Sequence, residues 1–181
     1  PTRRRGHTGT VEDSTALGGL GAWIRRNSWG LGLAAIAFLA GVAMRWWVLG
    51  TALGTADLDE SAVGVQALRF ADGDIQAFFL GQPYGGTLET GLVAVILQVF
   101  GPSVVALKVA PMLLAAAAAV ICWRIAVRLD LNRFAQWAVP ILVWLGPAFS
   151  VWQSTKERGF YGVAFVLATL CILVVLRFAD H

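Results

Sequence analysis

Histidine and cysteine are scarce in this sequence, and neither residue type is placed to bind a metal ion. The two histidines, His7 and His181, lie in the terminal segments without a second ligand nearby, so we expect no histidine-based metal site. The two cysteines, Cys122 and Cys171, lie inside apolar runs, which favours small core residues. They therefore carry no information about the redox compartment.

Charged residues are also few, and the apolar residues are not spread as in a soluble domain. Charged residues make up 14% of the 181 residues and hydrophobic residues 57%. The apolar residues form blocks of about 20, the length that a helix needs to cross a hydrocarbon core of roughly 30 Å. The alternation with period two that a transmembrane barrel would require is missing. The sequence therefore predicts an all-α integral membrane protein.

The chain divides into a polar start and a membrane domain. Residues 1–28 are rich in arginine and glycine, and we expect a mobile tail there with a short surface helix near 17–26. Residues 29–181 form the membrane domain, whose apolar blocks predict four spans. The predicted spans cover residues 29–49, 104–123, 135–152 and 160–176.

Two shorter helices are predicted between the first and second spans. The first covers residues 60–72, where Val63 and Ala67 repeat at helical spacing while Gln66 and Arg69 fall off that face. This pattern is typical of a helix that lies along a membrane surface.

The second short helix, over residues 87–100, is apolar but too short to cross a membrane. We interpret it as a juxtamembrane helix. A fifth span here would place the cluster of Arg124, Arg128 and Arg133 on the outer side, against the positive-inside rule.

The charges orient the four predicted spans. The arginines of the tail and those after the second span fall on the cytoplasmic side, so the N-terminus is expected in the cytoplasm. The acids then lie on the outer face: Asp57, Asp59, Glu60, Asp72, Asp74, Glu89 and Glu157. The cations on that face are Arg45, Arg69, Lys108, Lys156 and Arg158.

Asp59 and Glu60 are the first candidates for chemistry, because they follow a span within about ten residues and should lie at the outer interface. A carboxylate there can deprotonate an acceptor hydroxyl, or hold a divalent cation against a phosphate. Both acids would equally suit the N-terminus of helix 60–72, where negative charge is favourable. The sequence leaves these interpretations open. Asp57 has the same ambiguity, with a stronger lean toward a solvated loop.

Lys156, Glu157 and Arg158 follow the third predicted span, next to Trp152. Two cations at a lipid–water boundary suit a lipid-linked phosphate, which arginine can bind through two N–H groups. They would equally serve as ordinary interfacial anchors. Trp152 suits the aromatic belt of a membrane protein.

A polar, glycine-rich loop separates the two short helices and contains Gln82 and Tyr84. Its glycines permit a ligand to approach the backbone closely. Glu89 follows at the start of the apolar helix, where an unpaired acid is costly, so we expect it to pair with a cation or to contact a ligand. The candidate cations are Arg69, Lys156 and Arg158.

The order of these motifs along the chain is informative. The acid pair Asp59-Glu60 precedes the run Gly-Gln-Pro-Tyr-Gly-Gly-Thr-Leu-Glu over 81–89, a short apolar helix that ends in Phe-Gly-Pro-Ser over 100–103, and Lys-Glu-Arg-Gly-Phe-Tyr over 156–161. Over roughly residues 30–178 this order resembles the N-terminal module of bacterial GT-C glycosyltransferases. These are polyprenyl-phosphate-sugar enzymes related to protein O-mannosyltransferases and aminoarabinose transferases.

The resemblance implies an inverting transfer of a sugar from a polyprenyl-phosphate donor to an acceptor on the outer face of the bacterial cytoplasmic membrane. It implies that Asp59, or else Glu60, is the general base, and that Lys156 and Arg158 face the donor phosphate or the acceptor. Glu157 would be a second acid. The substrate-binding residues expected from the resemblance and the loop are Gln82, Tyr84, Glu89, Lys156, Glu157, Arg158 and Tyr161. The sequence leaves open whether a divalent cation takes part.

Proteins of this family are typically longer, with several further spans. This chain begins with proline and ends soon after its fourth predicted span, so we expect a processed or cut piece that lacks a C-terminal half. The alternative is a non-catalytic subunit that kept the fold and packs in a larger membrane complex. A transporter or channel is a weaker interpretation, because no ionisable residue lies deep inside a predicted span. Membrane lipid and a polyprenyl-phosphate sugar are the expected partners, and nucleic acid is not.

Overall fold

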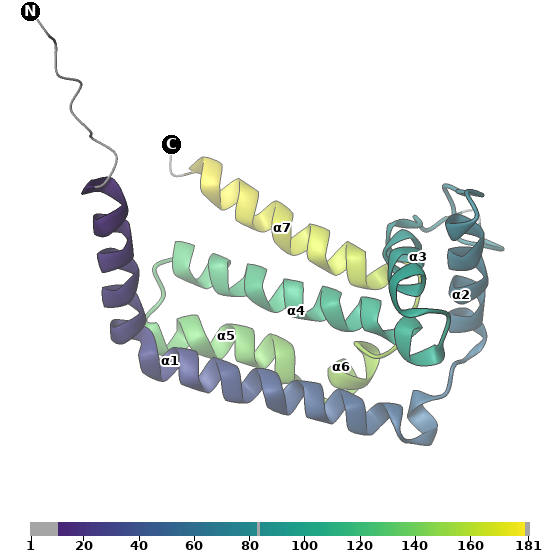
Figure 1. Cartoon of the computed structure of the whole chain (residues 1–181), viewed down its shortest axis with the longest axis horizontal. Helices are drawn as coiled ribbons and strands as arrows, with labels where there is room; N and C mark the ends of the chain where they lie inside the picture. Colours follow the sequence, from purple (N-terminus) through teal and green to yellow (C-terminus); the bar gives the residue numbers. More distant parts are fainter. Residues whose placement is uncertain (1–10, 83, 180–181) are drawn as a thin grey trace, which may run out of the picture. The chain divides into compact units, whose positions relative to one another are not determined.

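The computed structural model describes residues 11–82 and 84–179, and its regular secondary structure is helical (Figure 1). The chain folds as two compact units with a boundary between Ile36 and Ala37. All side-chain contacts discussed below lie within the second unit. The elements are α1 (Val11–Leu49), η1 (Ala52–Gly54), α2 (Leu58–Ala71), α3 (Leu88–Phe100), α4 (Val104–Arg128), α5 (Arg133–Leu145), α6 (Ala148–Gln153) and α7 (Tyr161–Ala179).

Three helical segments are long and apolar enough to cross a membrane: Ala22–Leu49, Val104–Arg128 and Tyr161–Ala179. Large apolar side chains on them face outward, as Ile172 and Phe178 of α7 do with exposed fractions of 52% and 74%. Cys171, predicted as a core residue, is exposed on the same helix because α7 packs on the protein along one side only. The chain is thus an all-α, multi-pass membrane protein.

The predicted third span over residues 135–152, which contains Pro140 and Pro147, is not a single helix of spanning length. This stretch forms α5 and α6, which are separated at Gly146 and Pro147. The N–H of Gly146 closes the last turn of α5 at Leu142, 2.8 Å away, and Pro147 has no N–H with which to continue the helix. Pro140 lies within α5 without ending it. The described residues therefore hold three helices of spanning length.

The start of the chain also differs from the prediction. The short surface helix near 17–26 and the first span over 29–49 form one uninterrupted helix, α1, because no proline interrupts this stretch. Its apolar part begins at Ala22. Of the predicted mobile tail, residues 11–28 are therefore helical, and residues 1–10 lie outside the described part of the chain.

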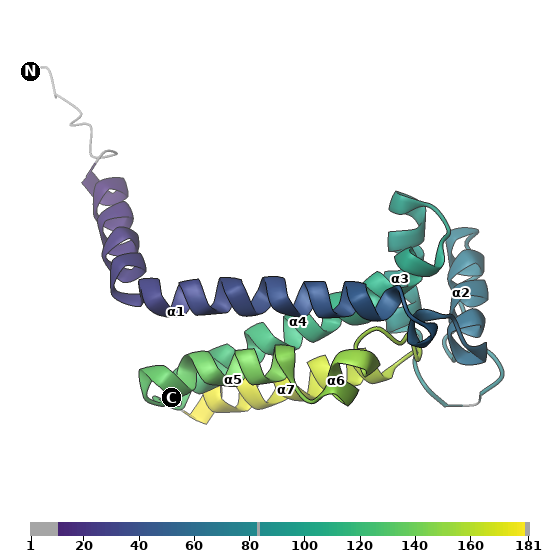
Figure 2. The same cartoon turned by 90° about the horizontal axis from the view of Figure 1, so that it is seen from below.

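Helix α4 is the centre of the second unit: α5 and α7 pack along it, and α2 and α3 lie at its N-terminal end (Figures 1 and 2). An apolar core joins α2, α3 and α4, and includes Val63, Val93 and Ala110, each with an exposed fraction of 0%. Gln66, predicted to lie off the buried face of α2, is buried as well. It is buried because its amide binds the backbone of the following loop, through Phe78 O at 2.8 Å and Leu80 N at 3.2 Å.

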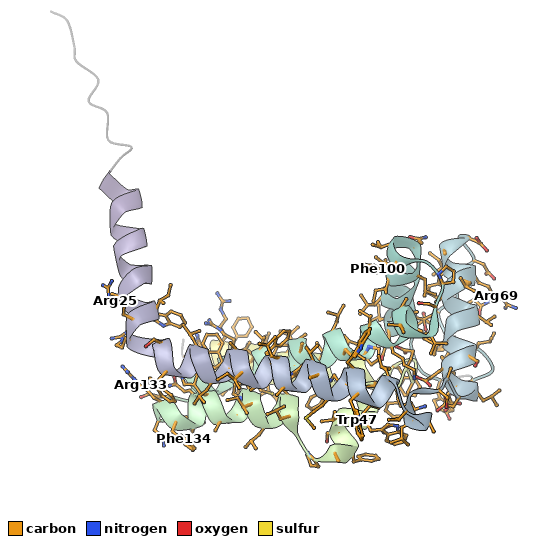
Figure 3. All side chains as sticks on the ribbon, turned by 60° about the horizontal axis from the view of Figure 1, so that its bottom comes forward. Arg25, Trp47, Arg69, Phe100, Arg133 and Phe134 are labelled. Atoms are coloured by element: carbon orange, nitrogen blue, oxygen red, sulfur yellow. The ribbon has the colours of Figure 1, made fainter. Side chains whose placement is uncertain are left out.

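The segment formed by α5 and α6 returns along α4. It begins just after the C-terminus of α4, and it ends near the N-terminus of α4, where Lys108 Nζ donates to Thr155 O at 3.3 Å. Figure 3 shows Arg133 and Phe134, at the start of α5, far from Arg69 and Phe100, which lie on α2 and α3. The chain between α4 and α7 thus covers the length of α4 even though its helix is broken.

Candidate functional site

Glu60 is the centre of a buried polar network where α2, α4 and the loop after α6 meet. Its side chain has an exposed fraction of 0%, and its carboxylate forms ion pairs with Lys108 Nζ and with Lys156 Nζ, the latter at 3.0 Å. It also accepts the backbone N–H groups of Asp57 and Glu157, both at 3.1 Å. This carboxylate holds three segments together, and the donors around it leave little capacity to accept a substrate proton.

Asp57 is the N-cap of α2, and Glu60 completes a capping box with it. The Asp57 side chain accepts the Glu60 N–H at 3.1 Å while the Glu60 side chain accepts the Asp57 N–H. The capping interpretation of the acid cluster is therefore correct for Glu60, with Asp57 as its partner. Partial burial favours a higher pKa for Asp57, but the Glu60 N–H, Lys156 and Arg158 outweigh it and lower the pKa below its ordinary value.

Asp59 differs from both neighbours because its carboxylate faces solvent. Its side chain is 57% exposed, and its contact among the described residues is Arg158 Nη1, 3.5 Å from Oδ2. Arg158 also approaches Asp57, at 4.0 Å. Of the two predicted catalytic acids, Asp59 thus keeps a carboxylate that another molecule can reach.

Glu89 and Glu157 form a buried pair of carboxyl groups. Their exposed fractions are 1% and 0%, and the two side chains influence each other's pKa. Burial, together with the negative charge of Glu89, raises the pKa of Glu157 to about 9, so Glu157 is protonated at neutral pH. Glu157 Oε1 accepts the Gly159 N–H at 2.9 Å, and its Oε2 has no hydrogen-bond partner among the described residues.

Of the two outcomes expected for Glu89, a cation partner or a ligand contact, the cation partner is not found among the described residues. Its carboxylate binds the first turn of α7, with Val163 N 3.2 Å from Oε2, and the Gly162 N–H adds a second bond. Burial raises the pKa of Glu89, while these donors and Glu157 oppose the rise. The positive end of the α7 dipole takes the place of a cation, while Arg69 lies on the outer side of α2 (Figure 3).

The glycine-rich loop packs against the segment that precedes α7. Phe79 N donates to Gly85 O at 3.1 Å, and the ring of Phe160 lies where a Cβ on Gly85 would stand. Tyr84 is 61% exposed and meets Phe160 edge to face at 6.5 Å. Gln82 is half-buried, and its Oε1 has no hydrogen-bond partner within the described part of the chain.

A cavity of about 650 Å³ lies between α4, the break between α5 and α6, and the start of α7. One part of its wall is polar, and the other is apolar. The polar part includes Arg45, Glu89, Gln153, Lys156, Arg158 and Tyr161. The apolar part includes Pro111, Leu114, Leu142 and Phe165. Its volume and mixed wall are typical of a site for a small or lipid-like molecule.

The cavity gathers several of the predicted substrate-binding residues. Glu89, Lys156, Arg158 and Tyr161 lie on its wall. Glu157 is not part of the wall, but it interacts electrostatically with Glu89, which is. Gln82 and Tyr84 are not part of the wall.

Sequence reasoning missed two members of the site, Arg45 and Lys108. Both are buried, with exposed fractions of 2% and 0%, although they were expected at the outer surface. Both lie within helices of spanning length. An ionisable residue in an apolar helix is a signal for a functional or paired group, and it could have identified them.

The two predicted acids, Asp59 and Glu60, do not belong to a preformed cluster of metal-binding side chains among the described residues. Within residues 11–82 and 84–179 no group of three or more metal-binding side chains is placed to hold a metal ion. The carboxylate of Glu60 is bound by two ammonium groups, which would repel a divalent cation.

Comparisons of the chain with protein-family models, with curated proteins and with solved structures found no match.

Proposed function

We propose that the chain is the N-terminal module of a membrane glycosyltransferase that moves a sugar from a polyprenyl phosphate to an acceptor. The observation that carries the proposal is the cavity, whose apolar wall continues into a cationic one, and whose Arg158 lies 3.5 Å from the accessible carboxylate of Asp59. An isoprenoid chain suits the apolar part, and its phosphate suits the cationic part. The resemblance over residues 30–178 points to the same chemistry.

In the proposed reaction, Asp59 accepts the proton of the acceptor hydroxyl while the hydroxyl oxygen attacks the anomeric carbon of the sugar. The bond between that carbon and the phosphate oxygen breaks, and the electron pair leaves with the polyprenyl phosphate. Arg158 lies 3.5 Å from the Asp59 carboxylate and contacts it from one side. Glu60 is a positioning residue, because it fixes α2 and thereby the backbone that carries Asp59.

The proposal includes an orientation in the bacterial cytoplasmic membrane. The acids lie near the N-terminal end of α4. Arg124, Arg128 and Arg133 lie within its last two turns or just beyond its C-terminal end. By the positive-inside rule the arginine end faces the cytoplasm, which places Asp59 outside and the N-terminus inside. The α5–α6 segment then makes a fourth, broken crossing, which is tolerated where the break lines a cavity.

The test uses the full natural chain in membrane vesicles that also contain the cell's own acceptors. Undecaprenyl-phosphate mannose or undecaprenyl-phosphate aminoarabinose is added, and the undecaprenyl phosphate released is measured by mass spectrometry. Loss of the base in Asp59→Asn should reduce release by about 10²- to 10⁴-fold. Asp72→Asn, which changes an exposed acid at the other end of α2, should leave release unchanged.

Release by Asp59→Asn at the wild-type rate would reject the proposed base. No release from either donor, together with copurification of the chain with one stoichiometric larger membrane protein, would favour the non-catalytic subunit instead. One observation speaks for that alternative: the exposed apolar face of α7 could pack against further helices as well as against lipid.

A further inference from the structure

We propose that Arg45 binds the phosphate of the amphiphile in the cavity. The proposal rests on the proposed function for the nature of the lipid, and it differs from the expectation that Lys156 and Arg158 hold the phosphate. It follows from the partners of each cation on or near the cavity wall.

The other cations at this end of the protein already have carboxylate partners. Glu60 pairs with both Lys108 and Lys156, and Lys156 Nζ also lies 3.3 Å from Asp57 Oδ2. Arg158 lies 3.5 Å from Asp59 Oδ2. A second anion would have to compete with these carboxylates for the same positive charges.

Arg45 has only neutral partners among the described residues. Its Nη1 donates to Gly41 O at 3.0 Å, its Nη2 to Trp144 O at 3.0 Å, and its Nε to Ser154 Oγ at 2.9 Å. Its guanidinium lies 3.6 Å from the centre of the Trp144 ring. None of the ion pairs in the described part of the chain involves Arg45. These bonds use three of its five N–H donors, so two remain.

The charge of Arg45 is thus only partly balanced. Trp144 O belongs to the last turn of α5, and the end of a helix carries roughly half a negative charge, spread over its terminal carbonyls. Arg45 is 2% exposed and lies in a helix of spanning length, where an unbalanced charge is costly. An anion in the cavity would remove this cost.

The cavity also indicates the kind of anion. Beside Arg45 its wall carries Ser150, Gln153 and Ser154, and the wall continues into the apolar side chains of Leu142 and Phe165. A phosphate on an apolar chain matches both parts, because the headgroup can meet the N–H donors while the chain contacts the apolar wall. Free inorganic phosphate would match only the first part.

The experiment measures binding rather than transfer, by native mass spectrometry of the full chain in nanodiscs. The probes are undecaprenyl phosphate, undecaprenol and inorganic phosphate. The variants are Arg45→Gln, Arg45→Lys and Arg158→Gln. The control is Arg124→Gln, because Arg124 also lies over a tryptophan ring, at 5.7 Å from Trp123, but is exposed and outside the cavity.

We expect the wild type to bind undecaprenyl phosphate at least 10-fold more tightly than undecaprenol. Arg45→Gln should abolish this preference, whereas Arg45→Lys, Arg158→Gln and Arg124→Gln should keep it. The thermal unfolding of each variant is recorded as well, to show whether the variant is folded. If Arg45→Gln does not fold, the comparison of Arg45→Lys with Arg158→Gln decides: a preference lost in Arg158→Gln but kept in Arg45→Lys would overturn the assignment.

Equal binding of undecaprenol and undecaprenyl phosphate to the wild type would also overturn it, and so would an unchanged preference in a folded Arg45→Gln. Inorganic phosphate that binds as tightly as the lipid would overturn the choice of an amphiphile. The outcome is separable from that of the proposed function, because Asp59→Asn should lose transfer and keep the binding preference. A preference that depends on Arg45 without any sugar transfer would leave the phosphate site standing and reject the enzyme.

Discussion

The carboxylate of Glu60 and the ammonium group of Lys108 form an ion pair in which both side chains have an exposed fraction of 0%. The pair joins the first turn of α2 to α4 across 48 positions in the sequence. Lys108 also donates to Thr155 O at 3.3 Å, which brings the loop after α6 to the same point. A charge removed from such a site leaves its partner buried, so removing one member should destabilise the protein more than removing both.

Lys108→Met should destabilise the protein by about 3–5 kcal/mol, because Glu60 loses one of its two cations and stays buried. The double variant Glu60→Gln with Lys108→Met should be less destabilised than Lys108→Met alone, since no ionised carboxylate is then left without that cation. The measurement is thermal unfolding in detergent, followed by tryptophan fluorescence. Arg69→Gln, an exposed cation on α2, is the control and should shift unfolding by less than about 0.5 kcal/mol.

A double variant no more stable than Lys108→Met alone would contradict this role. It would mean that the charge of Lys108 does not stabilise the buried carboxylate of Glu60.

The helical, membrane-spanning architecture could be predicted from apolar block lengths, because a spanning helix needs only a run of apolar residues. The break in the stretch 135–152 could not be placed, since Pro140 and Pro147 look equivalent in the sequence. Pro140 lies inside α5, whereas Pro147 follows a glycine that ends it. Which proline ends a helix depends on whether the surrounding packing satisfies the freed carbonyl.

The composition of the site was predictable but its pairing was not. The acids and the Lys156–Arg158 segment were identified as one chemical group from their place near span ends. Their division into a buried network around Glu60 and an exposed Asp59 depends on Lys108, which is 48 residues away in the sequence. The pairing of Glu89 with Glu157 was also out of reach, because two acids can lie together only when one keeps its proton. Burial raises the pKa of Glu157 enough for this, and the sequence does not show which acids are buried.

Stability should depend on pH through Glu157. Its pKa is raised from an ordinary value of 4.5 to about 9, so the stabilisation is fully present below 4.5 and is lost as the pH rises toward 9. Glu157→Gln does not titrate, yet its amide can donate to Glu89 and its oxygen can accept the Gly159 N–H. The unfolding temperature of this variant relative to wild type should therefore rise between pH 6 and pH 9.

The control for this experiment is Asp72→Asn, which neutralises an exposed acid, and its difference from wild type should stay constant over the same range. Parallel curves for Glu157→Gln and wild type would mean that Glu157 does not take up a proton on folding.

The contact between α1 and α5 should depend on the absence of a side chain at Gly41. The indole of Trp144 occupies the place where a Cβ at this position would stand, its Nε1 donates to Phe38 O at 3.2 Å, and its ring stacks on that of Phe38. Gly41→Ala should therefore push Trp144 away and destabilise the protein by about 1–3 kcal/mol. Gly32→Ala is the matched control in the same helix, because nothing lies within 4 Å of that position.

Gly41→Ala should also weaken any binding at Arg45, because Trp144 O accepts a hydrogen bond from that side chain. Unfolding temperatures that rise equally for both alanine variants would show that Trp144 does not pack against α1 as described.

The start of α7 should be equally sensitive at Gly162. A Cβ here would lie 2.9 Å from Leu114 Cδ1 and 3.0 Å from Glu89 Oε1, so Gly162→Ala must displace the carboxylate that binds the first turn of the helix. We expect the free energy of unfolding to fall by about 1–3 kcal/mol, which thermal unfolding would measure. The backbone N–H of Val163 should also exchange with solvent faster. Gly91→Ala, in α3, has nothing within 4 Å and should gain up to about 1 kcal/mol from helix propensity. If Gly162→Ala gained as much as Gly91→Ala, Glu89 could not be the group that holds α7 in place.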